Sequence, residues 1–178
     1  VDGEKQKAWF KDGEGNLEET DFDFLHVCPL QTAPDFIRNS ELSDDAGWLD
    51  VDPGTLRSKH FSNVWGVGDV MNTTNAKTMA AARKQAPVVA HNIATVVAGK
   101  DNLASYDGYG SCPLTVERGK IVLAEFTYGG KVAPSFPTWF NDGTKATHFG
   151  WFLKAKMLPP IYWQGMLKGR EWMASPAY

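Results

Sequence analysis

The sequence lacks several features that define large classes of proteins. It contains no run of about eighteen apolar residues, so a transmembrane helix is not expected. It has only two cysteines, Cys28 and Cys112, which excludes the disulfide framework of small secreted domains. The net charge is −3 and no basic run is interleaved with aromatic residues, so nucleic acid is not an expected partner.

Several patterns that carry catalysis are also missing. There is no Walker loop, no GxGxxG and no serine, histidine and aspartate arrangement typical of hydrolases. The four histidines show no metal-ligand spacing with each other or with the cysteines, so no metal site is predicted. The chain opens without Met, without an apolar signal core and without a cleavage-site pattern, from which we expect an excerpt of a longer protein.

The composition that is present is globular, at 43% hydrophobic and 22% charged residues. Residues 8–20 predict a hairpin around the turn-forming residues 11–16. The apolar residues 22–28 predict a buried strand that ends at Pro29 and places Cys28 in the core. Residues 31–60 read as loop, with a short strand at residues 48–51.

Residues 61–98 organise the rest of the chain. They predict a buried strand at residues 64–67, a Gly68-Asp69 turn, a polar loop and an Ala-rich helix. A strand that ends in such a turn and feeds a helix places a carboxylate and a helix N-terminus beside a nucleotide-type ligand. The alternative is an ordinary tight turn, which Gly and Asp also favour.

The Ala-rich helix has its own sequence signals. Thr78 is a candidate N-cap and Gly99 a C-terminal glycine cap. Pro87 predicts a kink or a split. One apolar stripe is expected to face the core: Met79, Ala82, Ala86, Val89, Ile93 and Val96.

A second hairpin is predicted around residues 117–120, joining strands at residues 112–116 and 121–128. Cys112 precedes a proline at the start of this region. A single cysteine in a strand can be a small core residue, or its glycine- and proline-rich surroundings can expose it as a nucleophile.

The segment after residue 138 is aromatic and basic. It holds four of the seven tryptophans, together with several lysines and the Pro159-Pro160 pair. One interpretation is a packed helix pair with a basic outer face. The other is an interfacial membrane anchor, in which aromatic residues enter the headgroup boundary and lysines meet anionic lipid.

These pieces occur in the order found in one family. The stretch VWGVGDV…KTMAAARKQAPVVAHNI resembles the second FAD-binding segment of two-dinucleotide-binding-domain flavoproteins. The stretches YDGYGSCPL, IVLAEFTY and FGWFLKAKMLPPIYWQGMLKG are similar to the sulfide:quinone oxidoreductase family. The resemblance implies an α/β, partial FAD/NAD(P)-binding fold with a C-terminal helical membrane-associating tail.

The resemblance also divides the chain into three segments. Residues 1–60 would be the end of the second dinucleotide-binding domain and a connecting loop. Residues 61–138 would be the C-terminal part of the FAD-binding domain, and residues 139–178 the aromatic and basic amphipathic tail.

The implied chemistry is flavin-dependent oxidation of sulfide. Asp69 would bind the FAD ribityl chain and Gly68 would let the backbone approach it, while Lys77 and Thr78 would lie at the isoalloxazine end. Cys112 would be one of two redox cysteines. Sulfide would attack a disulfide or polysulfide bridge, and two electrons would pass through the flavin to a quinone.

The implied partners are sulfide, quinone and a membrane surface. Phe149, Phe152 and Tyr162 are candidates for the quinone pocket, and the tail would make the protein peripheral or monotopic. The GxGxxG domain and the second redox cysteine lie outside these residues. We therefore expect the isolated segment to be inactive, to bind FAD poorly and to expose apolar surface, with homo-oligomerisation as one consequence.

Two other interpretations remain open. One is a related flavoprotein, either a flavocytochrome c-like subunit or a type II NADH:quinone dehydrogenase. The latter would have the Gly-Asp turn and a membrane tail but would not need the cysteine. A non-catalytic membrane-docking domain with a degenerate flavin fold would keep the architecture without the reaction.

Overall fold

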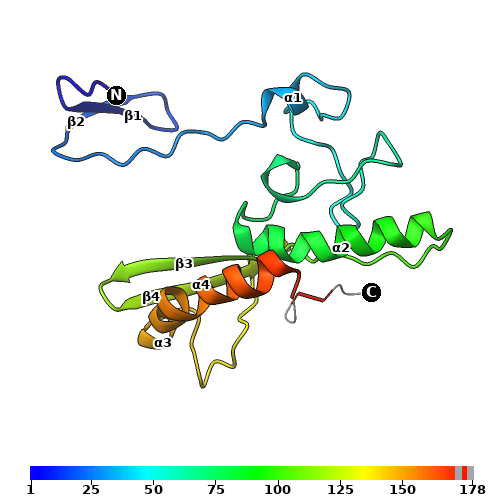
Figure 1. The fold of residues 1–178 in the computed structure, drawn as a ribbon. Coiled ribbons are helices and arrows are strands. Elements are labelled where there is room, and N and C mark those ends of the chain that lie inside the picture. Colours follow the sequence, from blue (N-terminus) through cyan, green and yellow to red (C-terminus); the bar gives the residue numbers. More distant parts are fainter. Residues whose placement is uncertain (171–173, 176–178) are drawn as a thin grey trace. The chain divides into compact units, whose positions relative to one another are not determined.

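The computed structural model describes residues 1–170 and 174–175. The chain forms two compact units, Val1–Gln31 and Thr32–Tyr178 (Figure 1). This division concerns compactness alone, so the three functional segments expected from the resemblance stay a prediction.

The first unit is a two-stranded antiparallel hairpin. Strands β1 (Lys7–Lys11) and β2 (Leu17–Asp21) pair with Lys7 opposite Asp21 and Lys11 opposite Leu17. Asp12 closes the turn, because its carboxylate accepts hydrogen bonds from the backbone N–H groups of Glu14 and Asn16. The predicted hairpin is confirmed.

The buried strand predicted at residues 22–28 is wrong. No strand forms there, the side chain of Phe24 is 87% exposed, and Cys28 is exposed rather than in the core. Apolar alternation makes a strand only where another strand accepts its hydrogen bonds, and the hairpin offers these residues no such partner.

The second unit begins with a short helix and a long loop region. Helix α1 (Asp35–Arg38) is followed by isolated bridges, among them a parallel bridge between Leu49 and Met71. The strands predicted at residues 48–51 and 64–67 are therefore reduced to isolated bridges at Leu49, Val51 and Trp65. A parallel strand needs a continuous neighbour, and the Leu49 to Met71 contact supplies one position only.

The core of the second unit lies between this loop region and the long helix α2. Its loop residues reach full burial because backbone hydrogen bonds close the loops around them, such as Gly66 N–H to Leu56 O at 2.9 Å. The core residues are Ile37, Leu49, Val51, Leu56, Met71, Val88, Val89, Ala104 and Tyr106.

Helix α2 (Met79–Val97) forms where the sequence predicts it. Thr78 is its N-cap, with the side-chain oxygen accepting a hydrogen bond from Ala81 N–H at 3.3 Å. Gly99 has a positive φ of 66° just beyond the last turn, as a glycine cap requires. Pro87 lies inside the helix without splitting it.

The stripe predicted to face the core is wrong. Of its members only Val89 is buried, while Met79, Ile93 and Val96 are exposed. The buried face consists of Ala81, Gln85, Val88, Val89, Asn92 and Thr95. Helical position alone could not reveal this, because Gln85 and Asn92 are buried through hydrogen bonds rather than through apolar character.

An antiparallel sheet follows α2. Strands β3 (Gly110–Glu117) and β4 (Lys120–Thr127) form the predicted hairpin, which is confirmed. Two short strands, β5 (Lys131–Val132) and β6 (Ala146–Thr147), each pair with β4. This mixture of helix and sheet is consistent with a partial flavoprotein fold.

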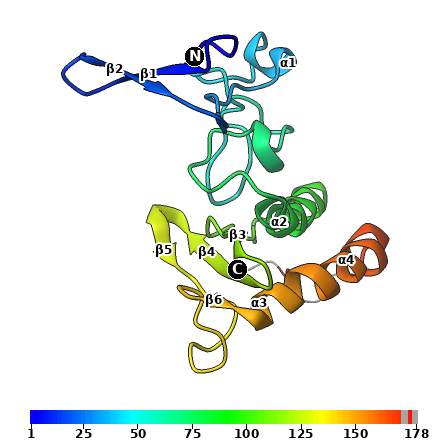
Figure 2. The same ribbon diagram turned by 90° about the vertical axis from the view of Figure 1, so that its left-hand side faces the viewer.

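The described part of the tail is a run of short helices. Helices α3 (His148–Phe152) and α4 (Leu158–Pro160) are interleaved with π-helical turns at Leu153–Met157 and Ile161–Gly165, and a 3₁₀ turn follows at Met166–Lys168. Helix α3 packs on β4 and α2 contacts β3, as Figures 1 and 2 show. Residues 171–173 and 176–178 of the predicted tail lie outside the described residues. Within residues 1–170 and 174–175, no helix combines the length and apolar character needed to cross a bilayer.

Candidate functional site

The Gly68-Asp69 turn is a 3₁₀ turn (Gly68–Val70) at the start of the site. Gly68 has a φ of 79°, and a Cβ atom there would meet nothing within 4 Å. Its backbone N–H donates a 2.7 Å hydrogen bond to Oε1 of Gln85, which is 0% exposed within α2. Gln85 therefore fixes the turn to the helix, while the Asp69 side chain stays exposed as a hydrogen-bond acceptor.

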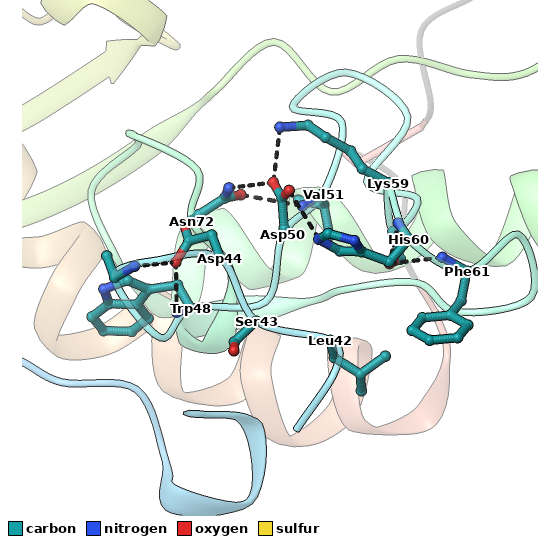
Figure 3. Close-up of polar contacts among 12 residues, drawn as sticks. Leu42, Ser43, Asp44, Trp48, Asp50, Val51, Lys59, His60, Phe61 and Asn72 are labelled. Atoms are coloured by element: carbon teal, nitrogen blue, oxygen red, sulfur yellow. Dashed lines mark hydrogen bonds and ion pairs between the residues drawn. The ribbon is translucent and has the colours of Figure 1, made fainter. Parts of the chain in front are cut away.

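The residues after the turn are held by a polar cluster centred on Asp50 (Figure 3). The Asp50 carboxylate accepts from Lys59 Nζ at 2.8 Å and from Asn72 Nδ2 at 2.7 Å, and His60 Nε2 lies 3.2 Å away. Lys59 and the other donors hold the pKa of Asp50 below its ordinary value. Asn72 also accepts from Val51 N–H, so the cluster joins three loop segments.

Lys77 folds back onto the protein. Its Nζ donates to the Met71 carbonyl at 2.5 Å and lies 4.5 Å from the centroid of the Trp48 ring. Burial lowers the pKa of Lys77, and the nearby Asp69 charge opposes that effect. Its ammonium group is thus anchored to a carbonyl and an aromatic face, within reach of the Asp69 charge.

A cavity of about 670 Å³ lies between the start of α2, the β3–β4 hairpin and the tail helices. The elements that line it are brought together by the packing of α2 and the tail around the hairpin. Polar and aromatic side chains line it from these elements and from the loops before β3 and after β5: Thr78, Arg83, Lys84, Asp107, Tyr109, Ser111, Cys112, Glu125, Ser135, Phe136 and Tyr162.

Three of the residues predicted from the sequence line this cavity: Thr78, Cys112 and Tyr162. Cys112 is a free, exposed cysteine on β3, opposite Ala124 in the antiparallel register. Of the two meanings left open for this cysteine, exposure excludes the small core residue and leaves the accessible thiol.

The other predicted residues lie elsewhere. Gly68, Asp69 and Lys77 belong to the turn and its loop and do not line the cavity. Phe149 contacts the cavity-lining Phe136 edge-to-face at 5.1 Å between ring centroids, and Phe152 is exposed on α3.

The polar end of the cavity is built around Glu125, which is only 3% exposed. Its Oε1 accepts from the Tyr109 hydroxyl at 2.5 Å and from the Ser135 hydroxyl, and its Oε2 accepts from Ser135 N–H at 2.9 Å. Burial, with the hydrogen bond to Glu125, raises the pKa of Tyr109 to about 12. The Tyr109 hydroxyl therefore keeps its proton at neutral pH.

Sequence reasoning missed Gln85, Tyr109, Glu125 and Ser135. Glu125 gave one local signal, because it is the only charged residue in the apolar stretch of residues 121–126. A charge buried in a strand needs partners, and their identity depends on which loop folds over the strand. In residues 1–170 and 174–175, no three His, Cys, Asp or Glu side chains are grouped so as to hold a metal ion.

Comparisons with known proteins give a consistent result. The chain is 39% identical over 98% of its length to the mitochondrial sulfide:quinone oxidoreductase of Schizosaccharomyces pombe. It is 40% identical over 96% of its length to that of Dictyostelium discoideum, and 36% identical over 98% to that of Mus musculus. It spans about two fifths of the length of these curated relatives. No family model matches.

A solved structure is similar as well. One chain in the cryo-EM structure of the Tetrahymena thermophila mitochondrial ATP synthase, an F1Fo composite tetramer, matches with a TM-score of 0.75 and 26% identity. The match covers 96% of this chain and 41% of that chain. The resemblance first read from YDGYGSCPL and the aromatic tail is confirmed: over nearly its whole length, this chain is sulfide:quinone oxidoreductase-like.

Proposed function

We propose that this chain is part of an FAD-dependent oxidoreductase that oxidises sulfide and reduces a quinone in mitochondria. The observation that carries the proposal is Cys112, a free and exposed thiol. It lines the cavity between the start of α2 and the tail helices. Support also comes from the relatives, three mitochondrial sulfide:quinone oxidoreductases that are 36–40% identical to this chain.

The turn residues fit the flavin half of FAD. Gly68 presents open backbone, and the exposed Asp69 carboxylate can accept hydrogen bonds from ribityl hydroxyls. Thr78 and the first turn of α2 can face the isoalloxazine end, where a helix N-terminus favours negative charge. When bound, FAD supplies a two-electron acceptor between sulfide and quinone.

Cys112 acts as one redox cysteine, paired with a second cysteine outside this chain. Sulfide attacks one sulfur of the bridge between them and the S–S bond breaks. A persulfide then forms on one cysteine and a thiolate on the other. A nucleophilic sulfur acceptor, such as a second sulfide, would then take the outer sulfur of the persulfide and leave a second thiolate. As the two thiolates rejoin as the disulfide, bound FAD would accept the two electrons and pass them to a quinone, so one sulfide would be oxidised for each quinone reduced.

The tail supports docking on a membrane surface. Its exposed apolar side chains include Phe152, Trp163 and Leu167, and lysines flank them at residues 154, 156 and 168. Aromatic residues at the headgroup boundary with lysines beside anionic lipid would bring the cavity close to a lipid-soluble quinone.

A second candidate function is a non-catalytic component of a mitochondrial assembly. It is favoured by the similarity to a chain of the Tetrahymena thermophila ATP synthase structure. Under this alternative the flavoprotein-like fold would pack against other subunits of the assembly, and Cys112 would have no redox partner.

The proposal is tested with the longest gene product that contains these residues. We expect a bound-flavin absorbance spectrum that sulfide bleaches and that decylubiquinone restores. NADH should leave the flavin oxidised. A flavin reduced by NADH and not by sulfide would favour the NADH:quinone dehydrogenase alternative. A protein without flavin would favour the non-catalytic one.

A further inference from the structure

A hydrogen-bonded chain of three side chains lies along the wall of the cavity. Ser135 is exposed, Glu125 is buried, and Tyr109 is half-buried, and all three line the cavity. The hydroxyl groups of Tyr109 and Ser135 both donate to Oε1 of Glu125, and the two hydroxyl oxygens lie 3.4 Å apart.

This cluster comes from three separate segments. Tyr109 precedes β3, Glu125 is on β4, and Ser135 follows β5. Every side-chain hydrogen bond that Glu125 accepts comes from an uncharged donor: one phenol, one hydroxyl and one backbone N–H. A buried carboxylate held between two hydroxyl groups can take a proton from one and pass it to the other.

We propose that Ser135, Glu125 and Tyr109 form a proton path from solvent to the cavity, serving a quinone that is reduced there. The inference rests on the proposed function and deepens it, because it assigns residues to the proton uptake of that reaction. Reduction of a quinone to a quinol adds two electrons, which the flavin supplies, and two protons.

The proton balance follows the hydrogen bonds. A solvent proton reaches Ser135 and passes to Glu125, which becomes a neutral carboxylic acid. Glu125 gives its proton to the Tyr109 oxygen as the Tyr109 proton moves to a quinone oxygen. All three side chains return to their starting states, and a second passage delivers the second proton.

Other titratable groups face the same cavity and set its charge. Lys84 Nζ lies 5.7 Å from the centroid of the Tyr109 ring and brings a positive charge to this side of the cavity. The raised pKa of Tyr109 means that it is protonated throughout the physiological range. Among the residues that the structure describes, the other titratable groups on the cavity wall are Arg83, Asp107, Cys112 and Tyr162.

The test separates the two half-reactions in the longest gene product that contains these residues. Stopped-flow absorbance measures flavin reduction by sulfide without quinone, then flavin reoxidation by decylubiquinone. For Tyr109→Phe we expect reoxidation to fall by at least about tenfold, since positioned proton transfer typically contributes that much or more. Reduction by sulfide should stay within about twofold, because it does not use the path.

Two further readouts exclude a merely structural effect. The rate of flavin reoxidation in the unmodified protein should fall in deuterium oxide and should vary with pH. In Tyr109→Phe the reoxidation rate should no longer vary with pH. Binding of decylubiquinone to the oxidised protein, followed by tryptophan fluorescence, should change by less than about threefold. Glu125→Gln should slow reoxidation as well, because the amide cannot pass a proton onward.

Tyr128→Phe is the matched control. Its hydroxyl donates to the Pro53 carbonyl at 2.9 Å, burial raises the pKa of Tyr128 to about 12, and it does not line the cavity. This variant should reoxidise at the unmodified rate. The inference is overturned if Tyr109→Phe also reoxidises at that rate, or if both of its half-reactions fall together. If sulfide does not reduce the flavin of the unmodified protein, the proposed function itself fails.

Discussion

At the residue scale, Asn92 holds α2 to two loops. Asn92 is 0% exposed, and its Nδ2 donates to the carbonyls of Thr55 and Ala104 at 3.1 and 3.0 Å. Its Oδ1 accepts from Ala104 N–H at 2.7 Å. A single amide therefore pairs with three backbone groups, two of which belong to the fully buried Ala104.

Replacing Asn92 tests how much these bonds contribute. Asn92→Ala should lower the free energy of unfolding by about 2–4 kcal/mol, because buried backbone groups lose their partners. Urea denaturation followed by fluorescence measures the change. Asn102→Ala is the control, since Asn102 is exposed and its substitution should stay within about 0.5 kcal/mol. Equal effects of the two variants would contradict the assignment.

Residues with local signals were predictable, and residues whose partners are distant were not. Thr78 and Gly99 flank a helix that the sequence pattern predicts, so their roles as N-cap and C-terminal glycine cap could be inferred directly. Gln85 and Glu125 are polar residues whose burial depends on partners 17 and 10 positions away. Nothing in the sequence pairs Gln85 with Gly68, so the positioning of the turn emerges only from the fold.

At the scale of elements, α2 is apolar on the face that the core does not use. Its exposed members include Met79 and Ile93, and its buried members include Val88. A helix that is apolar all round is usually buried all round, so the outer face is suited to packing against further protein.

The assignment of faces can be tested by matched truncations. Val88→Ala should cost about 1–3 kcal/mol, because it removes two methyl groups from a residue that is 3% exposed. Ile93→Ala, at a residue that is 42% exposed, should cost less than about 1 kcal/mol in the same 178-residue chain. Thermal and urea unfolding measure both. A larger loss of unfolding free energy for Ile93→Ala than for Val88→Ala would favour the core-facing stripe predicted from the sequence.

Elements that depend on local turns were predicted well, and elements that depend on neighbours were not. The turn between β3 and β4 contains Gly119, which has a φ of 90°. Residues 117–120 predict this turn because glycine is the residue that favours a positive φ. The strand predicted at residues 64–67 has suitable residues, but only Trp65 forms a bridge there. Apolar residues allow a strand, and the available partners decide whether it forms.

At the scale of the whole molecule, the tail should bind lipid through its exposed aromatic side chains. We expect the double variant Phe152→Ser/Trp163→Ser to lower partitioning onto vesicles of phosphatidylcholine and cardiolipin by at least about tenfold. Both side chains are more than half exposed, so little folding energy is lost, and each contributes apolar area to the headgroup boundary. Co-sedimentation measures the partition coefficient.

The matched control removes exposed aromatic residues elsewhere. Trp9→Ser/Phe10→Ser changes two exposed side chains of the hairpin in the first unit and should leave partitioning unchanged. Equal loss in both double variants would show non-specific adsorption. Unchanged partitioning of the tail variant would favour the packed-helix interpretation.

The central claim is that Cys112 carries electrons from sulfide, and one measurement tests it most directly. Flavin bleaching by sulfide is recorded in the longest gene product that contains this chain, for the unmodified protein, Cys112→Ser and Cys28→Ser. Both cysteines are free and exposed here, so the two substitutions are chemically matched. We predict that Cys112→Ser abolishes bleaching and that Cys28→Ser bleaches at the unmodified rate. Full bleaching in Cys112→Ser would contradict the account.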